Sequence, residues 1–149
     1  MLRLKNNIYK ISSKEDGDLF WVKMGNFFAS KKIRKEFNGY PLNDSDDHTW
    51  FVTLDRNENV TAFLGVSLEK IHRNEGWITE MYTLPDYRQK GLAAKLLSTA
   101  IEYLQENDNI HFIKVVAHPE SYSHNLFKIN KFKVESTKGA YTYYSKKIR

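Results

Sequence analysis

The 149-residue sequence contains no cysteine, which excludes disulfide bonds and thiolate metal sites. Only 3 prolines and 7 glycines occur, too few for a fibrous or linker-rich chain. No apolar run approaches ~18 residues, the length that a membrane-spanning helix needs. The first residues also lack the apolar stretch of a secretory signal peptide. We therefore expect a single domain over residues 1–149, in the cytoplasm and without a membrane partner.

Charge and aromatic content narrow the class of protein. Aromatic residues make up 14% of the chain, which argues against disorder, and the formal net charge is +5. A positive charge favours anionic ligands such as nucleotides, coenzyme A or nucleic acid. Two basic clusters and nearby tyrosines keep a nucleic-acid-associated protein open as an alternative, although a solvated face explains them more simply. These residues are Lys31, Lys32, Arg34, Lys35, Lys146, Lys147, Arg149, Tyr141, Tyr143 and Tyr144.

The first half of the chain predicts two helices and an antiparallel meander. Helical spacing of apolar residues predicts helices over 14–30 and 31–37, the first interrupted near Gly25. Turn-forming residues fill 38–48, which we interpret as a loop. Alternating apolar residues and short turns at 55–59 and 73–76 predict consecutive strands. The predicted strands are 6–12, 50–54, 60–68 and 77–84.

The second half changes to helical periodicity. Residues 91–106 carry their apolar side chains on one helix face, and the apolar run 112–117 predicts a buried strand. A helix over 119–129, with Pro119 in its first turn, and two closing strands at 132–134 and 141–144 follow. A strand–helix–strand unit predicts that strands 77–84 and 112–117 are parallel, with a right-handed crossover.

The segment between strand 77–84 and helix 91–106 carries the clearest chemical signal. A helix N-terminus has unpaired backbone N–H groups and a partial positive charge. Gly91 allows a ligand to approach the backbone, and Arg88 and Lys90 add positive charge. The segment predicts a pyrophosphate site, although a plain loop with solvated cations is the alternative. It is neither a P-loop nor a G-x-G-x-x-G motif.

Arg88-x-x-Gly91-x-Ala93 resembles the [R/Q]-x-x-G-x-[G/A] signature of the GCN5-related N-acetyltransferase (GNAT) superfamily. The order of elements agrees over nearly the whole chain, and the residue pattern agrees over about 77–132. The resemblance implies a GNAT-type α/β fold, with a mixed, largely antiparallel sheet of six to seven strands and about four helices. It also implies that the sheet splays between strands 77–84 and 112–117. Acetyl-CoA would bind there and donate its acetyl group directly to a primary amine of a small molecule, peptide or protein.

The same resemblance suggests how the coenzyme is held. The backbone of strand 77–84 would pair with the pantetheine arm, and N–H groups at the start of the next helix would bind the pyrophosphate. The predicted coenzyme-binding residues are Met81, Tyr82, Thr83, Arg88, Gln89, Lys90, Gly91, Leu92, Ala93, Ala94 and Phe127.

Glu80 is the candidate that binds or deprotonates the acceptor amine. A carboxylate inside a sheet is costly unless it has a partner or a role, and the alternative is a solvated or salt-bridged glutamate. Strand alternation places Thr79 on the opposite face, where it is an alternative lining of the cleft. The loop 38–48 carries Asp44, Asp46 and Asp47, which would favour a cationic acceptor or simply be solvated.

Phe127 is the main departure from the family pattern. Relatives commonly have a tyrosine there that protonates the departing thiolate, and a phenyl ring has no proton to donate. Ser123, one helical turn earlier, is our candidate catalytic replacement. Tyr122, His124 and solvent are alternatives.

Three further expectations concern metals, partners and rival functions. The five histidines are scattered without metal-ligand spacing, so we expect no metal site. Dimers are common among relatives, which leaves a homodimer open, but no residue here argues for one. The rival functions are an acyl-CoA-binding sensor with weak catalysis and a nucleic-acid binder or base-modifying acetylase.

Overall fold

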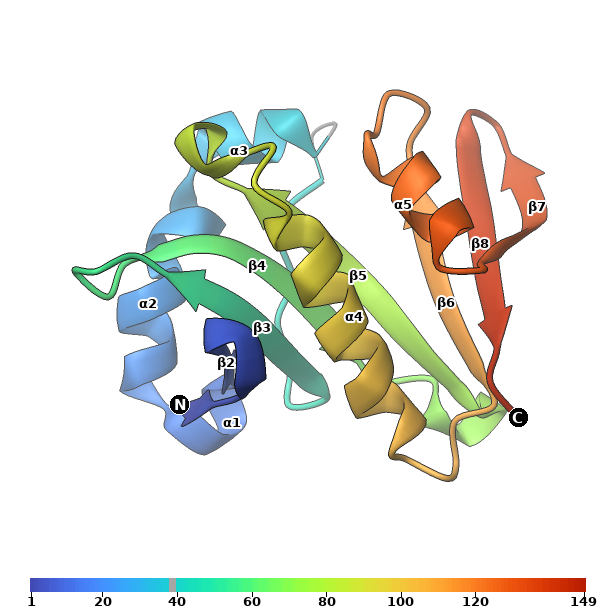
Figure 1. Cartoon of the computed structure of the whole chain (residues 1–149), viewed down its shortest axis with the longest axis horizontal. Helices are drawn as coiled ribbons and strands as arrows, with labels where there is room; N and C mark the ends of the chain where they lie inside the picture. Colours follow the sequence, from blue (N-terminus) through green and yellow to red (C-terminus); the bar gives the residue numbers. More distant parts are fainter. Residues whose placement is uncertain (38–39) are drawn as a thin grey trace.

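The computed structural model describes residues 1–37 and 40–149 (Figure 1). Eight strands form one sheet in the order β1-β2-β3-β4-β5-β6-β8-β7, one more strand than expected because Leu2–Arg3 adds an edge. The strands are β1 (Leu2–Arg3), β2 (Ile8–Ile11), β3 (His48–Leu54), β4 (Val60–Ser67), β5 (Glu75–Thr83), β6 (Phe112–Ala117), β7 (Lys133–Lys138) and β8 (Tyr141–Lys147). The α-helices are α1 (Ser13–Asp16), α2 (Asp18–Ala29), α3 (Lys31–Glu36), α4 (Leu92–Gln105) and α5 (Ser123–Ile129).

The sheet divides between β5 and β6. These two strands are parallel, as predicted, and every other neighbouring pair is antiparallel. Their pairing extends only from Glu75–Phe112 to Ile78–Val115. Beyond Ile78 the two strands diverge, and they stand well apart at the top of Figure 1. The predicted splay is therefore present.

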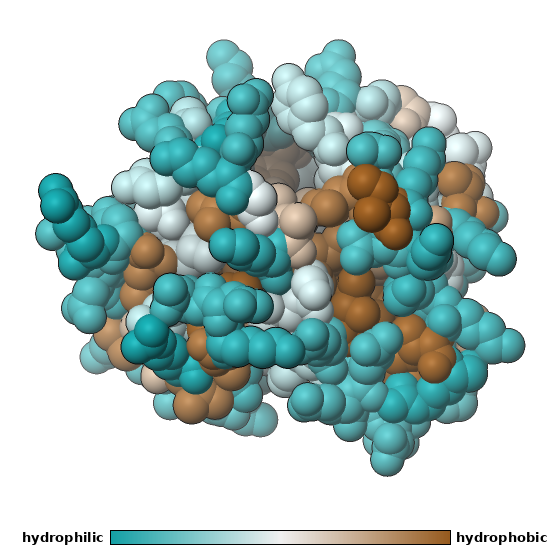
Figure 2. Space-filling model, in the orientation of Figure 1, coloured by the Kyte–Doolittle hydropathy of each residue, from teal (hydrophilic) through white to brown (hydrophobic). Residues whose placement is uncertain are grey.

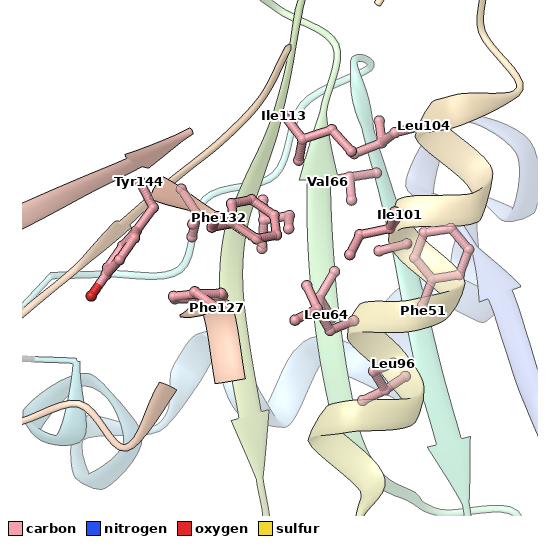
Figure 3. Close-up of a cluster of buried hydrophobic side chains, with 14 of the residues drawn as sticks. Phe51, Leu64, Val66, Leu96, Ile101, Leu104, Ile113, Phe127, Phe132 and Tyr144 are labelled. Carbon is pink, nitrogen blue, oxygen red and sulfur yellow. The ribbon is translucent and has the colours of Figure 1, made fainter. Parts of the chain in front are cut away.

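A hydrophobic core covers each face of the sheet. On one face, α4 and α5 bury a cluster that includes Leu64, Leu96 and Phe127 (Figure 3). On the other face, α2 and α3 bury a cluster centred on aromatic rings such as Phe20 and Trp50. These two cores fix the strands on both sides of the split.

The helix break lies at Gly17, not at Gly25, so that prediction was wrong. Gly17 has φ +54°, which separates α1 from α2, and α2 runs through Gly25 without interruption. The Ser12 hydroxyl caps α1 by accepting from the Glu15 N–H at 3.1 Å. Helical packing of Phe20 and Met24 against the sheet outweighs the low helix propensity of Gly25.

The C-terminal boundaries also differ from the prediction. Helix α5 begins at Ser123, because residues 119–122 form a turn in which the Ser121 N–H donates to the His118 carbonyl at 3.1 Å. Pro119 therefore lies before the helix. Strands β7 and β8 pair with each other and extend beyond the predicted ends. Across the described residues, no helix combines the length and apolar character needed to cross a membrane.

Candidate functional site

The N-terminus of α4 presents unpaired donors, as the sequence predicted. Gly91, at the N-cap, has φ +79°, and Gln89 also has a left-handed φ of +61°. The N-cap supplies no side-chain bond, and the first bond of the helix runs from the Lys95 N–H to the Gly91 carbonyl at 3.1 Å. The N–H groups from Gly91 to Ala94 thus lack helical partners. No atom of the described chain lies within 4 Å of the position that a Gly91 Cβ would take.

Arg88 has a structural role that the sequence did not indicate. Its Nε donates to the Thr83 carbonyl at 2.9 Å, and its guanidinium pairs with Glu36 of α3 at 3.2 Å. It also lies 5.4 Å from the centre of the Tyr82 ring. Burial and a hydrogen bond to Glu36 raise the pKa of Tyr82 to about 12, so the phenol stays neutral. Arg88 therefore ties the end of β5 to α3, while Lys90 of the same loop is exposed.

The predicted pantetheine-binding residues lie where the sheet is split. Met81, Tyr82 and Thr83 pair with β4 along one edge of β5. Their other edge faces the divergence, where β6 no longer pairs with β5. Figure 2 shows a recess near the top of the view. An extended ligand can add to such an edge as a strand does.

A bulge in β5 sets the position of Glu80. Leu64 pairs with Met81 and Val66 pairs with Ile78, so Gly65 alone faces both Thr79 and Glu80. A Cβ on Gly65 would lie 2.7 Å from Thr79 Oγ1 and 3.1 Å from Glu80 Oε2. Both side chains therefore lie on the α2 side of the sheet. The expectation that Thr79 points to the opposite face was wrong, because a bulge breaks the alternation.

Glu80 is electrostatically unusual. Burial raises its pKa to about 7 from 4.5, and the negative charge of Asp44 acts in the same direction. Hydrogen bonds from the Thr79 hydroxyl and the Asn43 N–H oppose this shift. Its Oε2 atom is buried and has no hydrogen-bond partner among the residues that the structure describes. Buried acceptors without a partner are rare, and a donor group of a ligand would supply the missing hydrogen bond.

Substitution of Gly65 by alanine is expected to destabilise the protein by about 1–3 kcal/mol, because the new methyl group overpacks the corner. Its Cβ would lie 2.9 Å from Trp50 Cζ3 in addition to its contacts with Thr79 and Glu80. Denaturant unfolding measures this loss. Gly25→Ala is the matched control, because no described atom lies within 4 Å of its Cβ position. A helical glycine-to-alanine change should stabilise the protein by about 0.4–1 kcal/mol. Equal effects in the two variants would contradict the close packing at Gly65.

The three aspartates of the loop before β3 differ in environment. Asp44 is partly buried, and it accepts hydrogen bonds from Trp50 Nε1 at 2.9 Å and from Ser13 Oγ at 2.5 Å. Asp46 and Asp47 are exposed, as a solvated loop would have them. Of the three carboxylates, it is Asp44 whose negative charge raises the pKa of Glu80.

The candidate acid residues lie on or beside α5. Ser123, the first residue of α5, shares a short hydrogen bond with the Ser121 hydroxyl. Phe127 is only 2% exposed and packs against Phe132 and Tyr144 (Figure 3). The phenyl ring therefore offers almost no surface to a ligand, and its assignment as a coenzyme contact finds no support in this packing.

His124 and Tyr144 form a connected pair. The His124 ring bonds through Nε2 to the His118 carbonyl at 2.8 Å and through Nδ1 to the Tyr144 hydroxyl at 2.7 Å. Because a carbonyl only accepts, Nε2 carries the proton and Nδ1 accepts from the Tyr144 O–H. Burial raises the pKa of Tyr144, which keeps this hydroxyl protonated. The pair links α5 to β8, and neither proton is free.

The remaining candidates were metal ligands and a basic surface for nucleic acid. Within residues 1–37 and 40–149, no three His, Asp or Glu side chains are grouped so as to hold a metal ion. The basic residues of α3 are exposed, whereas Tyr144 is buried in the core. This arrangement agrees with a solvated basic face.

Sequence reasoning missed three residues of the site. Gly65, Trp50 and Ser13 were not singled out, although Gly65 stands inside the clearest strand pattern. A glycine within a strand often marks a bulge or a close approach, and this signal was available. The bonds from Ser13 and Trp50 to Asp44 had no local signal, because Ser13 is 31 residues away from Asp44.

No curated protein sequence matches this chain. Solved structures with the same fold include spermidine N-acetyltransferase of Vibrio cholerae with CoA and spermine (16% identity, TM-score 0.71, 96% of both chains). Tetrahymena GCN5 has 14% identity and a TM-score of 0.69, with 98% of this chain and 97% of that chain covered. A GNAT-family acetyltransferase of Staphylococcus aureus Mu50 has 17% identity and a TM-score of 0.68, with 95% of this chain and 99% of that chain covered. The sequence profile of the acetyltransferase (GNAT) family matches residues 17–132. Together with the split sheet and the glycine turn before α4, this match shows that the chain belongs to the GNAT acetyltransferase family.

Proposed function

We propose that this protein transfers an acetyl group from acetyl-CoA to a primary amine, with Glu80 as the general base. The observation that carries the proposal is the unpartnered Oε2 of Glu80, which lies on β5 where that strand separates from β6. A base with a pKa of about 7 suits proton transfer at neutral pH.

The coenzyme would use two backbone features. Its pantetheine arm would pair with the open edge of residues 81–83, and its pyrophosphate would accept from the N–H groups of Gly91–Ala94. Lys90 is exposed beside these donors and adds positive charge. Coenzyme A bound in the Vibrio cholerae relative, which shares this fold, supports the assignment.

The chemistry follows from these positions. The ammonium group of the acceptor gives one proton to the Glu80 carboxylate, and the nitrogen lone pair then attacks the thioester carbon. The C–N bond forms, the C–S bond breaks, and the second amine proton passes through water to the departing thiolate. A thiolate is a good leaving group near neutral pH, so this route needs no tyrosine at position 127.

A primary amine of a small molecule or a peptide is the proposed acceptor. Glu80 and Asp44 place negative charge in one corner, which favours a cationic group. The related Vibrio cholerae structure contains spermine, a polyamine.

Calorimetric titration with acetyl-CoA, with ATP as a control, tests coenzyme binding. We expect micromolar affinity for acetyl-CoA and none for ATP at the same concentration. A screen of amines should then reveal acceptor-dependent release of free thiol. Failure to bind acetyl-CoA or coenzyme A would overturn the proposal.

A second function, an acyl-CoA sensor with weak catalysis, is favoured by Phe127, which has no hydroxyl and is buried. The two functions differ in one measurement. A sensor binds acetyl-CoA but releases no thiol with any amine in the screen, whereas the enzyme releases thiol at a rate that saturates with one acceptor.

A further inference from the structure

Asp44 and Glu80 come from distant parts of the sequence and meet in one corner of the protein. Both carboxyl oxygens of Asp44 accept a hydrogen bond. Oδ1 accepts from the Trp50 indole at 2.9 Å, and Oδ2 accepts from the Ser13 hydroxyl at 2.5 Å. The donors lie on β3 and α1, so the loop that carries Asp44 is fastened to two elements of the fold. Glu80, in contrast, has no donor to its Oε2 atom within the part of the chain that the structure describes.

The indole of Trp50 connects the two acids. Its Nε1 bonds to Asp44, while Cζ3 of the same ring lies 2.9 Å from the position of a Gly65 Cβ. Glu80 Oε2 lies 3.1 Å from that same position. Trp50 is fully buried, so this rigid ring holds Asp44 at a fixed place relative to Glu80.

The loop also covers Glu80 directly. The N–H of Asn43, next to Asp44, donates to the Glu80 carboxyl group. When Ser13 and Trp50 hold Asp44, they therefore also hold the Asn43 donor in place. The Oε2 atom of Glu80 still has no hydrogen-bond partner among the described residues.

We propose that Asp44 is a positioning residue for Glu80: anchored by Ser13 and Trp50, it fixes the loop over Glu80 and makes that carboxylate a stronger base for the acceptor amine. The inference rests on the proposed function, in which Glu80 receives the proton. Its physical basis is that a fixed negative charge nearby disfavours ionisation of a second carboxyl group.

Other titratable groups near this corner do not supply the same effect. His48 of β3 stacks on Trp50 with ring centres 5.8 Å apart, and its Nδ1 bonds to the Ser45 hydroxyl at 2.9 Å. Burial lowers the pKa of His48 below 6.5, against the opposing charges of Asp44, Glu69 and Asp47. Burial therefore disfavours the charged form of this ring.

The test is a carboxyl ¹³C NMR titration of the full chain, with the Glu80 resonance assigned by its absence in Glu80→Gln. Asp44→Asn keeps an oxygen for Trp50 and an amide that can donate to Ser13, but it removes the charge. We expect the Glu80 midpoint to fall by roughly 0.5–1 pH unit. Asp46→Asn removes the same charge from an exposed position of the same loop and should leave the midpoint in place. An unmoved midpoint in Asp44→Asn, or an equal shift in Asp46→Asn, would overturn the inference.

Ser13→Ala tests the anchoring separately, because it keeps the charge of Asp44 and removes one hydrogen bond. With an acceptor amine in hand, we expect a lower kcat/KM, unchanged acetyl-CoA affinity and an acidic limb of the pH profile that does not shift to lower pH. Full activity would overturn the anchoring role. The NMR titration needs no acceptor, so it tests the role of Asp44 by itself. Calorimetry and thiol release test the proposed acetyl transfer, so failure of one proposal can be distinguished from failure of the other.

Discussion

Replacement of Gly91 by glutamate is expected to weaken acetyl-CoA binding by at least ~100-fold. The new side chain would bring a negative charge and bulk into the open space in front of the α4 N–H groups. Loss of two charge-assisted hydrogen bonds, at about 1.5–3 kcal/mol each, accounts for an effect of this size. Isothermal titration calorimetry of the folded variant measures it.

Gly139→Glu is the matched control for this experiment. Gly139 has φ +60°, close to the +79° of Gly91, and likewise has nothing within 4 Å of its Cβ position. It lies in the turn between β7 and β8, so it carries a similar conformational cost without touching α4. Gly139→Glu should bind acetyl-CoA normally. If the two variants bind equally well, the assignment of the pyrophosphate site is wrong.

Glu80→Gln is expected to reduce kcat/KM by about 10²–10⁴-fold, the usual contribution of a general base. Coenzyme affinity should not change, because the proposed coenzyme contacts are backbone groups further along β5 and at the start of α4. In the unmodified enzyme, activity should rise through about pH 7 as Glu80 loses its proton. The glutamine variant should lack that acidic limb. Full activity of the variant would remove Glu80 from the mechanism.

The same substitution should increase stability at alkaline pH. The pKa of Glu80 in the folded protein is about 7, above its value of 4.5 in the unfolded chain, so the folded state holds this proton more tightly. Its stability therefore declines as pH rises from about 4.5 through 7. Glutamine carries no charge and escapes this decline. Urea unfolding at pH 8 should show a gain on the order of 2–3 kcal/mol for Glu80→Gln, and no gain at pH 4.

The order of elements and the turn at the N-terminus of α4 were predictable from local patterns. Alternation identified β4, helical spacing identified α4, and the left-handed turn before α4 followed from Gly91. These features depend on residues close together in the sequence. The family match over residues 17–132 and the split between β5 and β6 agree with what the signature implied.

The surroundings of Glu80, Asp44 and Phe127 were not predictable in the same way. Whether Thr79 shares a face with Glu80 depends on a bulge, and the bulge depends on Gly65 in the neighbouring strand. The environment of Asp44 depends on Trp50 and on Ser13, which belongs to another element of the fold. Burial of Phe127 depends on Tyr144 and Phe132. Local periodicity contains none of these long-range contacts.

The unpaired edge of β5 also has a consequence for solubility. Among the described residues, no strand pairs with one edge of residues 79–83, and such edges are templates for association between chains. The outer edge strand β7 carries Lys133 and Lys138 at its ends, which discourage pairing, but the edge within the split lacks such protection. A coenzyme bound along β5 would complete the sheet and, at 100 times its Kd, add about 2.7 kcal/mol to stability. Aggregation on storage should therefore follow the fraction of protein that is free of coenzyme.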